Sequence, residues 1–141
     1  MADDLRDAVV GVRDVEYLQH RYLDHPHNHY ELLLVTSRFT GAARGVMVLR
    51  VHDGVCELLD LIAPLRNIPC LVDQARRLIT RWGVGELYCW VSRHQAWRFT
   101  ATDGRVHPLD IRIPTSVWIN GPPVEMVRDR WWLMSGDTDF R

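Results

Sequence analysis

The sequence contains no lysine, and all 17 of its basic residues are arginine. Schiff-base enzymes need a lysine nucleophile, and P-loop nucleotide-binding proteins need the lysine of their phosphate loop, so both classes are excluded. The formal net charge of −1 shows no excess of basic residues for binding nucleic acid or an acidic membrane surface. We therefore expect neither nucleic acid nor membrane as a partner.

Long apolar runs are also missing. The longest have the length of a strand, too short for a helix that spans a bilayer, and the acidic beginning of the chain does not resemble a signal peptide. Cys56, Cys70 and Cys89 lie far apart without CxxC spacing, which favours buried free thiols in a reducing compartment. We expect a cytoplasmic protein without a membrane span.

The stretch from Val55 to Trp82 organises the rest of the chain. Residues 55–62 form an apolar run that predicts a buried strand. From residue 68 to residue 82 apolar side chains recur near the 3.6-residue period, which predicts an amphipathic helix packed on that strand. Residues 86–91 predict the next strand. The helix has an expected N-cap, an early proline and a terminating glycine: Asn67, Pro69 and Gly83.

The 141 residues fit one domain, 1–141, in which 1–13 is a poorly defined N-terminal segment. Before the central stretch we expect a helix at 15–23, capped by Asp14, and strands at 30–38 and 45–51. The Asp53-Gly54 pair predicts a hairpin turn into the central strand. After the central stretch we expect a helix at 93–101, which begins with a capping box from Ser92 to Gln95. Strands are expected at 109–113, 117–119 and 130–134, and a polar turn at 136–139. The pattern predicts a mixed α+β fold with a central mixed sheet covered by helices.

This order of elements resembles the GNAT superfamily (GCN5-related N-acetyltransferases). Three motifs carry the resemblance: Arg21-Tyr22-Leu23 with His25-Pro26 and Tyr30, the strand sequence LLDLIA at 58–63, and WLMSGDTD at 132–139. Together they resemble the C-terminal half of tandem-GNAT bacterial proteins. The resemblance implies a twisted central mixed sheet flanked by helices, acetyl-CoA or another acyl-CoA as cofactor, and transfer of the acyl group to a small-molecule amine.

The resemblance places the cofactor at the end of the central strand and the beginning of the following helix. The implied cofactor-binding residues are Ile62, Ala63, Arg66, Asn67, Cys70, Leu71, Ser92 and Arg93. In the GNAT pattern this loop contains glycines whose N–H groups bind pyrophosphate, whereas residues 64–69 contain no glycine. An ordinary strand-to-helix turn is therefore an equal alternative for the loop, and a helix cap is the alternative for Ser92.

Asp60 is the candidate catalytic residue. Strand alternation predicts that it shares a face with Cys56, Leu58 and Ile62, and a carboxylate in such a place needs a partner. It is either a structural carboxylate paired with an arginine or backbone donors, or a general base that takes a proton from the amine.

Four residues are candidates for binding the amine: Tyr30, Trp90, Asp137 and Asp139. The alternative for the two aspartates is turn chemistry, in which Asp bonds to its own backbone. His25, His27 and His29 form an HPHNH segment that could bind zinc or nickel, but no recognised ligand spacing completes it, and we expect no metal site. One of Trp131 and Trp132 is expected to face away from the core.

Three functions remain open: an acyltransferase, a non-catalytic GNAT-like scaffold or dimerisation domain, and a metal-dependent enzyme. Backbone donors aimed at a cleft would favour the acyltransferase, and a filled cleft would favour the scaffold. Because no first strand is recognisable, the strand at 30–38 or its neighbour is expected at an unprotected edge of the sheet. The expected partner is a second copy of the chain or a second GNAT-like half.

Overall fold

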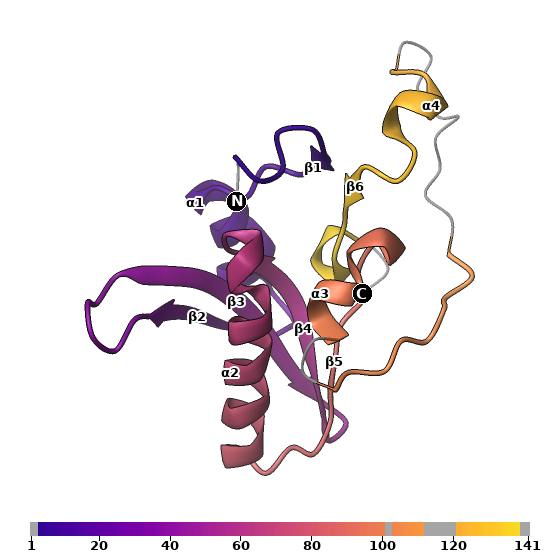
Figure 1. Cartoon of the computed structure of the whole chain (residues 1–141). Helices are drawn as coiled ribbons and strands as arrows, with labels where there is room; N and C mark the ends of the chain where they lie inside the picture. Colours follow the sequence, from indigo (N-terminus) through magenta and orange to yellow (C-terminus); the bar gives the residue numbers. More distant parts are fainter. Residues whose placement is uncertain (1–2, 101–102, 112–120, 139–141) are drawn as a thin grey trace.

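The computed structural model describes residues 3–100, 103–111 and 121–138, and Figure 1 shows how their helices and strands are arranged. The main sheet has four strands in the order β2-β3-β4-β5, antiparallel except for the parallel pair of β4 and β5. A smaller sheet pairs β1 with β6 in parallel. The mixed α+β class is therefore confirmed. The strands are β1 (Val9–Val10), β2 (Glu31–Thr36), β3 (Ala43–His52), β4 (Val55–Ile62), β5 (Leu87–Tyr88) and β6 (Trp131–Trp132).

The long helix α2 (Ile68–Arg81) lies across one face of the main sheet (Figure 1). The other helices are short: α1 (Val15–Leu18) continuing into a π-helical turn (Gln19–Leu23), α3 (Trp97–Thr100) after a 3-10 turn (Arg93–Gln95), α4 (Val124–Val127), and 3-10 turns Leu65–Asn67 and Ser135–Asp137. No helix in the described ranges combines the length and the apolarity needed to cross a membrane.

The predicted packing of α2 on β4 is confirmed. Leu71 and Ile79 of the helix are buried in one cluster with Leu58 and Leu61 of the strand. We call this side of the sheet the α2 face. On the opposite side, which we call the tyrosine face, a second cluster contains the buried residues Tyr22, Val48 and Leu59. The sheet is therefore covered on both faces near the carboxyl end of β4.

The predicted local signals at the turns are largely confirmed. Asp53 and Gly54 have φ angles of 50° and 79°, as the hairpin turn between β3 and β4 requires. Gly83, at φ 76°, follows the last turn of α2. Asp14 caps α1, since its carboxylate accepts a hydrogen bond from the N–H of Tyr17 at 2.8 Å.

A β-bulge in β4 decides the face on which Asp60 lies. Leu58 and Asp60 pair with adjacent residues of β3, so Leu59 is an extra residue in the ladder. One extra residue inverts the alternation of side chains along a strand. Leu58 packs on the α2 face, whereas Leu59 and Asp60 contact Tyr22 on the tyrosine face. The expectation that Asp60 shares a face with Cys56 and Leu58 is therefore wrong.

Two predicted caps do not form as expected. Asn67 stands at the N-cap of α2, but its side chain makes no capping bond and donates instead to the carbonyl of Arg44 at 2.9 Å. Ser92 likewise does not cap the turn that follows it, because its hydroxyl accepts from the N–H of Leu133 at 2.9 Å. In both cases a tertiary contact holds the side chain.

Several predicted elements have other bounds or are absent. The predicted strand at 109–113 is not a strand in its described part, 109–111, and the predicted strand at 117–119 lies outside the described residues. The strand at 86–91 is reduced to β5 and an isolated antiparallel bridge between Val91 and Met134. A two-residue strand, β1, exists within the segment 1–13, but it pairs with β6 rather than beside β2.

The expectations for cysteine and tryptophan burial are only partly met. Cys56 is buried and Cys89 is half-buried, but Cys70 is exposed on the first turn of α2. All three are free thiols. Trp132 is fully buried and Trp131 is half-buried, so the described chain itself covers much of both side chains.

Candidate functional site

Asp60 is completely buried, and its carboxylate binds four groups of the chain. Oδ1 accepts from Nε of Arg13 at 2.7 Å and from the N–H of Leu61 at 2.9 Å. Oδ2 accepts from the hydroxyls of Tyr17 and Tyr22, each at 3.2 Å. A carboxylate has about four acceptor positions. The geometry therefore favours the structural alternative for Asp60, because its acceptor positions are already used within the chain.

Arg13 joins Asp60 to Asp137. Its Nη2 donates to Oδ2 of Asp137 at 2.5 Å, and the same oxygen accepts from the N–H of Met134 at 2.9 Å. Burial raises the pKa of Asp137 although Arg13 opposes this effect. Burial by itself would lower the pKa of Arg13, but the two carboxylates raise it. One buried guanidinium thus holds two carboxylates from β4 and from the C-terminal turn.

Two of the motifs that suggested a GNAT relationship contact each other here. Arg21 donates through Nε to the carbonyl of Gly136 at 3.1 Å and through Nη2 to the carbonyl of Thr138. A Cβ atom at Gly136 would lie 3.0 Å from the carbonyl oxygen of Leu59. The C-terminal turn is thereby fixed between the π-helical turn after α1 and the bulge of β4.

The two tyrosines beside Asp60 stay protonated. Burial, followed by the charge of Asp60, raises the pKa of Tyr17 to about 12 and raises the pKa of Tyr22 further. Both hydroxyls therefore donate hydrogen bonds at neutral pH.

A second buried carboxylate, Glu57, lies on the tyrosine face of β4 beside β5. Its Oε2 accepts from Nη2 of Arg50 at 3.1 Å and from the hydroxyl of Tyr88 at 3.3 Å. The hydroxyl of Tyr88 lies 2.8 Å from Nε2 of His52, whose side chain is 37% exposed. Burial and then the charge of Glu57 raise the pKa of the Cys89 thiol to about 12. This cluster connects a buried carboxylate to solvent through a tyrosine and a histidine.

The N-terminal segment lies against the loop between β4 and α2, which was expected to bind the cofactor. The N–H of Leu65 donates to Oδ2 of Asp4 at 2.9 Å. The next residue, Leu5, is 4% exposed and belongs to the hydrophobic core of the α2 face. Asp4 and Leu5 of the chain itself therefore lie beside the beginning of α2, where the resemblance placed the cofactor.

The C-terminal segment lies between β4 and the continuation of β5. The two strands pair through only two residue pairs, after which Val91 bridges to Met134. Trp132 and Met134 are 0% and 1% exposed, and Gly136 lies against Leu59 of β4. The opening between the diverging strands is filled by the chain itself.

The other residues implied for cofactor binding do not converge. Ile62 and Ala63 line a surface hollow of about 260 Å³ together with residues of β2 and β3. Leu71 is buried in the core, where it lies under Gly45. The remaining side chains point to solvent or to tertiary contacts already described: Arg66, Cys70 and Arg93 are exposed, and Asn67 and Ser92 bind the backbone.

The residues expected to bind an amine are also dispersed. Tyr30 packs against Tyr22, and the guanidinium carbon of Arg50 lies 5.9 Å from the centroid of the Tyr30 ring. Trp90 is half-buried, and Asp137 is held by Arg13. Asp139 lies outside the described residues.

The backbone of the HPHNH segment bends at Pro26 and His27. Nδ1 of His25 accepts from the N–H of Asn28 at 3.0 Å, and His29 lies 3.3 Å from Glu31. Within the described ranges, no three histidine, cysteine, aspartate or glutamate side chains are grouped so that they could hold a metal ion. The geometry gives no support to the metal-dependent alternative.

Sequence reasoning expected an arginine or backbone donors as partners of Asp60 but did not identify Arg13, and it did not consider Glu57. Arg13 is 47 positions away from Asp60, and no local pattern connects them. Glu57 could have been found, because the argument that a carboxylate in an apolar strand needs a partner applies equally to it. Asp4 carried no signal, since it lies among several acidic residues at the beginning of the chain.

Comparison with protein-family models, with curated proteins and with solved structures gives no match for this chain.

Proposed function

We propose that this chain is a non-catalytic GNAT-like domain that acts as a scaffold for a partner subunit. The observation that carries the proposal is the filled opening between β4 and the continuation of β5, where Trp132 and Met134 are buried. In the resemblance described above, this opening would receive the acyl-CoA. The contact of Asp4 with the N–H of Leu65 supports the same conclusion, because it uses a donor of the expected phosphate loop.

Calorimetry with acetyl-CoA tests the proposal. We expect no binding heat and no rise of the thermal midpoint at about 1 mM ligand, since a ligand that binds only the folded state must stabilise it. The variant Asp4→Ala, which releases the N–H of Leu65, should also fail to bind because the opening remains filled. A dissociation constant in the low micromolar range for the unmodified chain would refute the scaffold proposal.

The second candidate is an N-acyltransferase acting on a small-molecule amine, and the Glu57 cluster is the observation that favours it. A base removes a proton from the amine, whose nitrogen attacks the thioester carbonyl and forms the amide as the C–S bond breaks, and the released CoA thiolate takes up a proton to give the free thiol. Asp60 was the expected base, but Glu57 has a connection to solvent through Tyr88 and His52. Release of free CoA thiol in the presence of an amine panel, abolished by Glu57→Gln, would favour this candidate. No release with any amine would count against it.

A further inference from the structure

The outer edge of β2 is open within the described residues. β2 is the last strand on its side of the main sheet, and β1 pairs elsewhere. Its sequence, ELLLVT, contains no proline, and its protection as an edge strand is limited to the charge of Glu31 at one end and an irregularity between Val35 and Thr36 at the other. Leu34 in the middle of the strand is 63% exposed. The edge therefore offers unpaired backbone groups beside an exposed apolar side chain.

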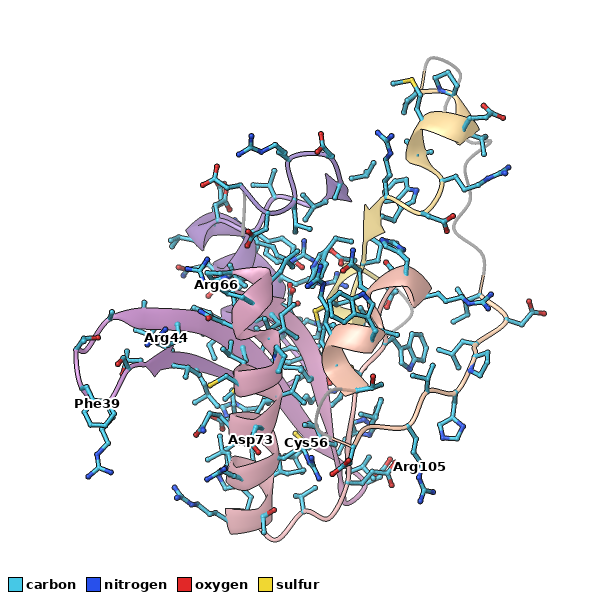
Figure 2. All side chains as sticks on the ribbon, viewed as in Figure 1. Phe39, Arg44, Cys56, Arg66, Asp73 and Arg105 are labelled. Atoms are coloured by element: carbon cyan, nitrogen blue, oxygen red, sulfur yellow. The ribbon has the colours of Figure 1, made fainter. Side chains whose placement is uncertain are left out.

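The hairpin that joins β2 to β3 projects away from the sheet and from α2 (Figure 1). Phe39 lies at its tip with 95% of its surface exposed, and Figure 2 shows its ring pointing away from the rest of the molecule. Arg38 precedes it in the same turn. An exposed phenylalanine at the end of a projecting hairpin offers apolar area whose burial by a second surface would be favourable.

A hollow of about 330 Å³ lies at the opposite end of the same strand. His29 and Glu31 form its side next to the edge of β2, and Trp82 and Val51 give it an apolar floor. These two apolar side chains are 40% and 45% exposed. The strand thus has an exposed aromatic group at one end and an apolar hollow with a carboxylate at the other.

We propose that a second copy of this chain pairs with the edge of β2 in an antiparallel arrangement centred on Leu34. A two-fold axis perpendicular to the sheet sets Leu34 against Leu34 of the second copy and keeps both α2 helices on the same side. Phe39 comes five residues after Leu34 and His29 five residues before it. The axis therefore directs the tip of each hairpin toward the end of β2 at which the other copy has its hollow.

The charges of this arrangement are complementary. The pairing sets Ser37 of one copy opposite Glu31 of the other, and Arg38 follows in the turn beyond the end of β2 at Thr36, where the strict alternation of strand faces no longer applies. Because the interface is isologous, every contact occurs twice: two aromatic tips in two hollows, two arginine–glutamate pairs and one continuous sheet. The inference rests on the proposed scaffold function and names the surface through which the scaffold acts.

Multi-angle light scattering tests the interface on the full chain, in reductant because Cys70 is exposed. At about 100 micromolar, which populates a dimer with a micromolar Kd, we expect twice the monomer mass of 16.4 kDa. Leu34→Arg sets two like charges against each other at the axis and should halve the mass. Met126→Arg is the matched control, since Met126 is 57% exposed on α4, which lies far from β2 (Figure 1), and it should leave the dimer unchanged.

Charge exchange gives a test that does not depend on loss of structure. Glu31→Arg and Arg38→Glu should each weaken the dimer, and the double variant should restore it. A monomer mass for the unmodified chain, or a dimer that persists in Leu34→Arg, would overturn the inference. Binding of acetyl-CoA by the chain would instead overturn the scaffold proposal, whatever the mass. The two failures are therefore separable.

Discussion

Gly136 lies so close to Tyr22 that a Cβ atom at position 136 would be 2.1 Å from the hydroxyl oxygen of the tyrosine. The carbonyl of Leu59 limits movement in another direction, at 3.0 Å from the same position. A side chain fits there only if the Tyr22 side chain, the C-terminal turn or the bulge of β4 shifts. This contact explains in physical terms why glycine stands in the closing turn.

Gly136→Ala should therefore destabilise the fold by about 1–3 kcal/mol, the usual cost of overpacking a close-packed site. Urea unfolding measures the change. Gly85→Ala is the matched control, because no atom lies within 4 Å of a Cβ atom built at position 85. Equal midpoints for the two variants would contradict the steric account.

Asp60→Asn should lower the free energy of unfolding by roughly 3–5 kcal/mol, because it removes one partner of a buried ion pair and leaves Arg13 undercompensated. The control is Asp73→Asn, which breaks the exposed pair of Asp73 and Arg77 and should cost less than about 1 kcal/mol. If the two variants lost similar stability, the buried network would not be the main contribution of Asp60.

Leu71→Ala should cost roughly 2–5 kcal/mol, since its side chain is fully buried between α2 and β4. Leu23→Ala is the control, because that leucine is 60% exposed. Denaturant midpoints compare the two. A loss below about half a kcal/mol at Leu71 would contradict the packing of α2 on the sheet.

Stability should fall as the pH rises from about 9 toward 12. Burial, followed by the charge of Glu57, raises the pKa of Cys56 from 9.0 to about 11, and burial with the charge of Asp60 raises that of Tyr17 from 10.0 to about 12. The folded state then holds protons that the unfolded chain has already lost, so higher pH favours unfolding. The contribution is complete below the unfolded pKa and disappears above the folded one.

Urea midpoints at pH 8 and at about pH 10.5 measure this effect between the two sets of pKa values. Tyr17→Phe removes one of the raised groups and should reduce the loss between the two pH values. An unfolding midpoint that stays constant across this range in the unmodified chain would contradict the raised pKa values.

The sequence by itself determined the elements whose signals are local. The apolar period of residues 68–82 specified α2, and the Asp53-Gly54 pair specified the hairpin between β3 and β4. The carboxylate of Asp14 specified the beginning of α1. In each case the physical cause lies within a few residues: one stripe of the helix, one turn with positive φ, or one capping bond.

Only the tertiary structure decided what surrounds Asp60. The face of the sheet on which Asp60 lies depends on the β-bulge at Leu59, and this bulge is defined only by the pairing of β3 with β4. The charge partner of Asp60, Arg13, comes from a distant segment, and the filling of the opening beside β4 depends on where Trp132 packs. Bulges, long-range ion pairs and filled openings arise from the balance of packing and desolvation in the whole fold, which no local pattern encodes.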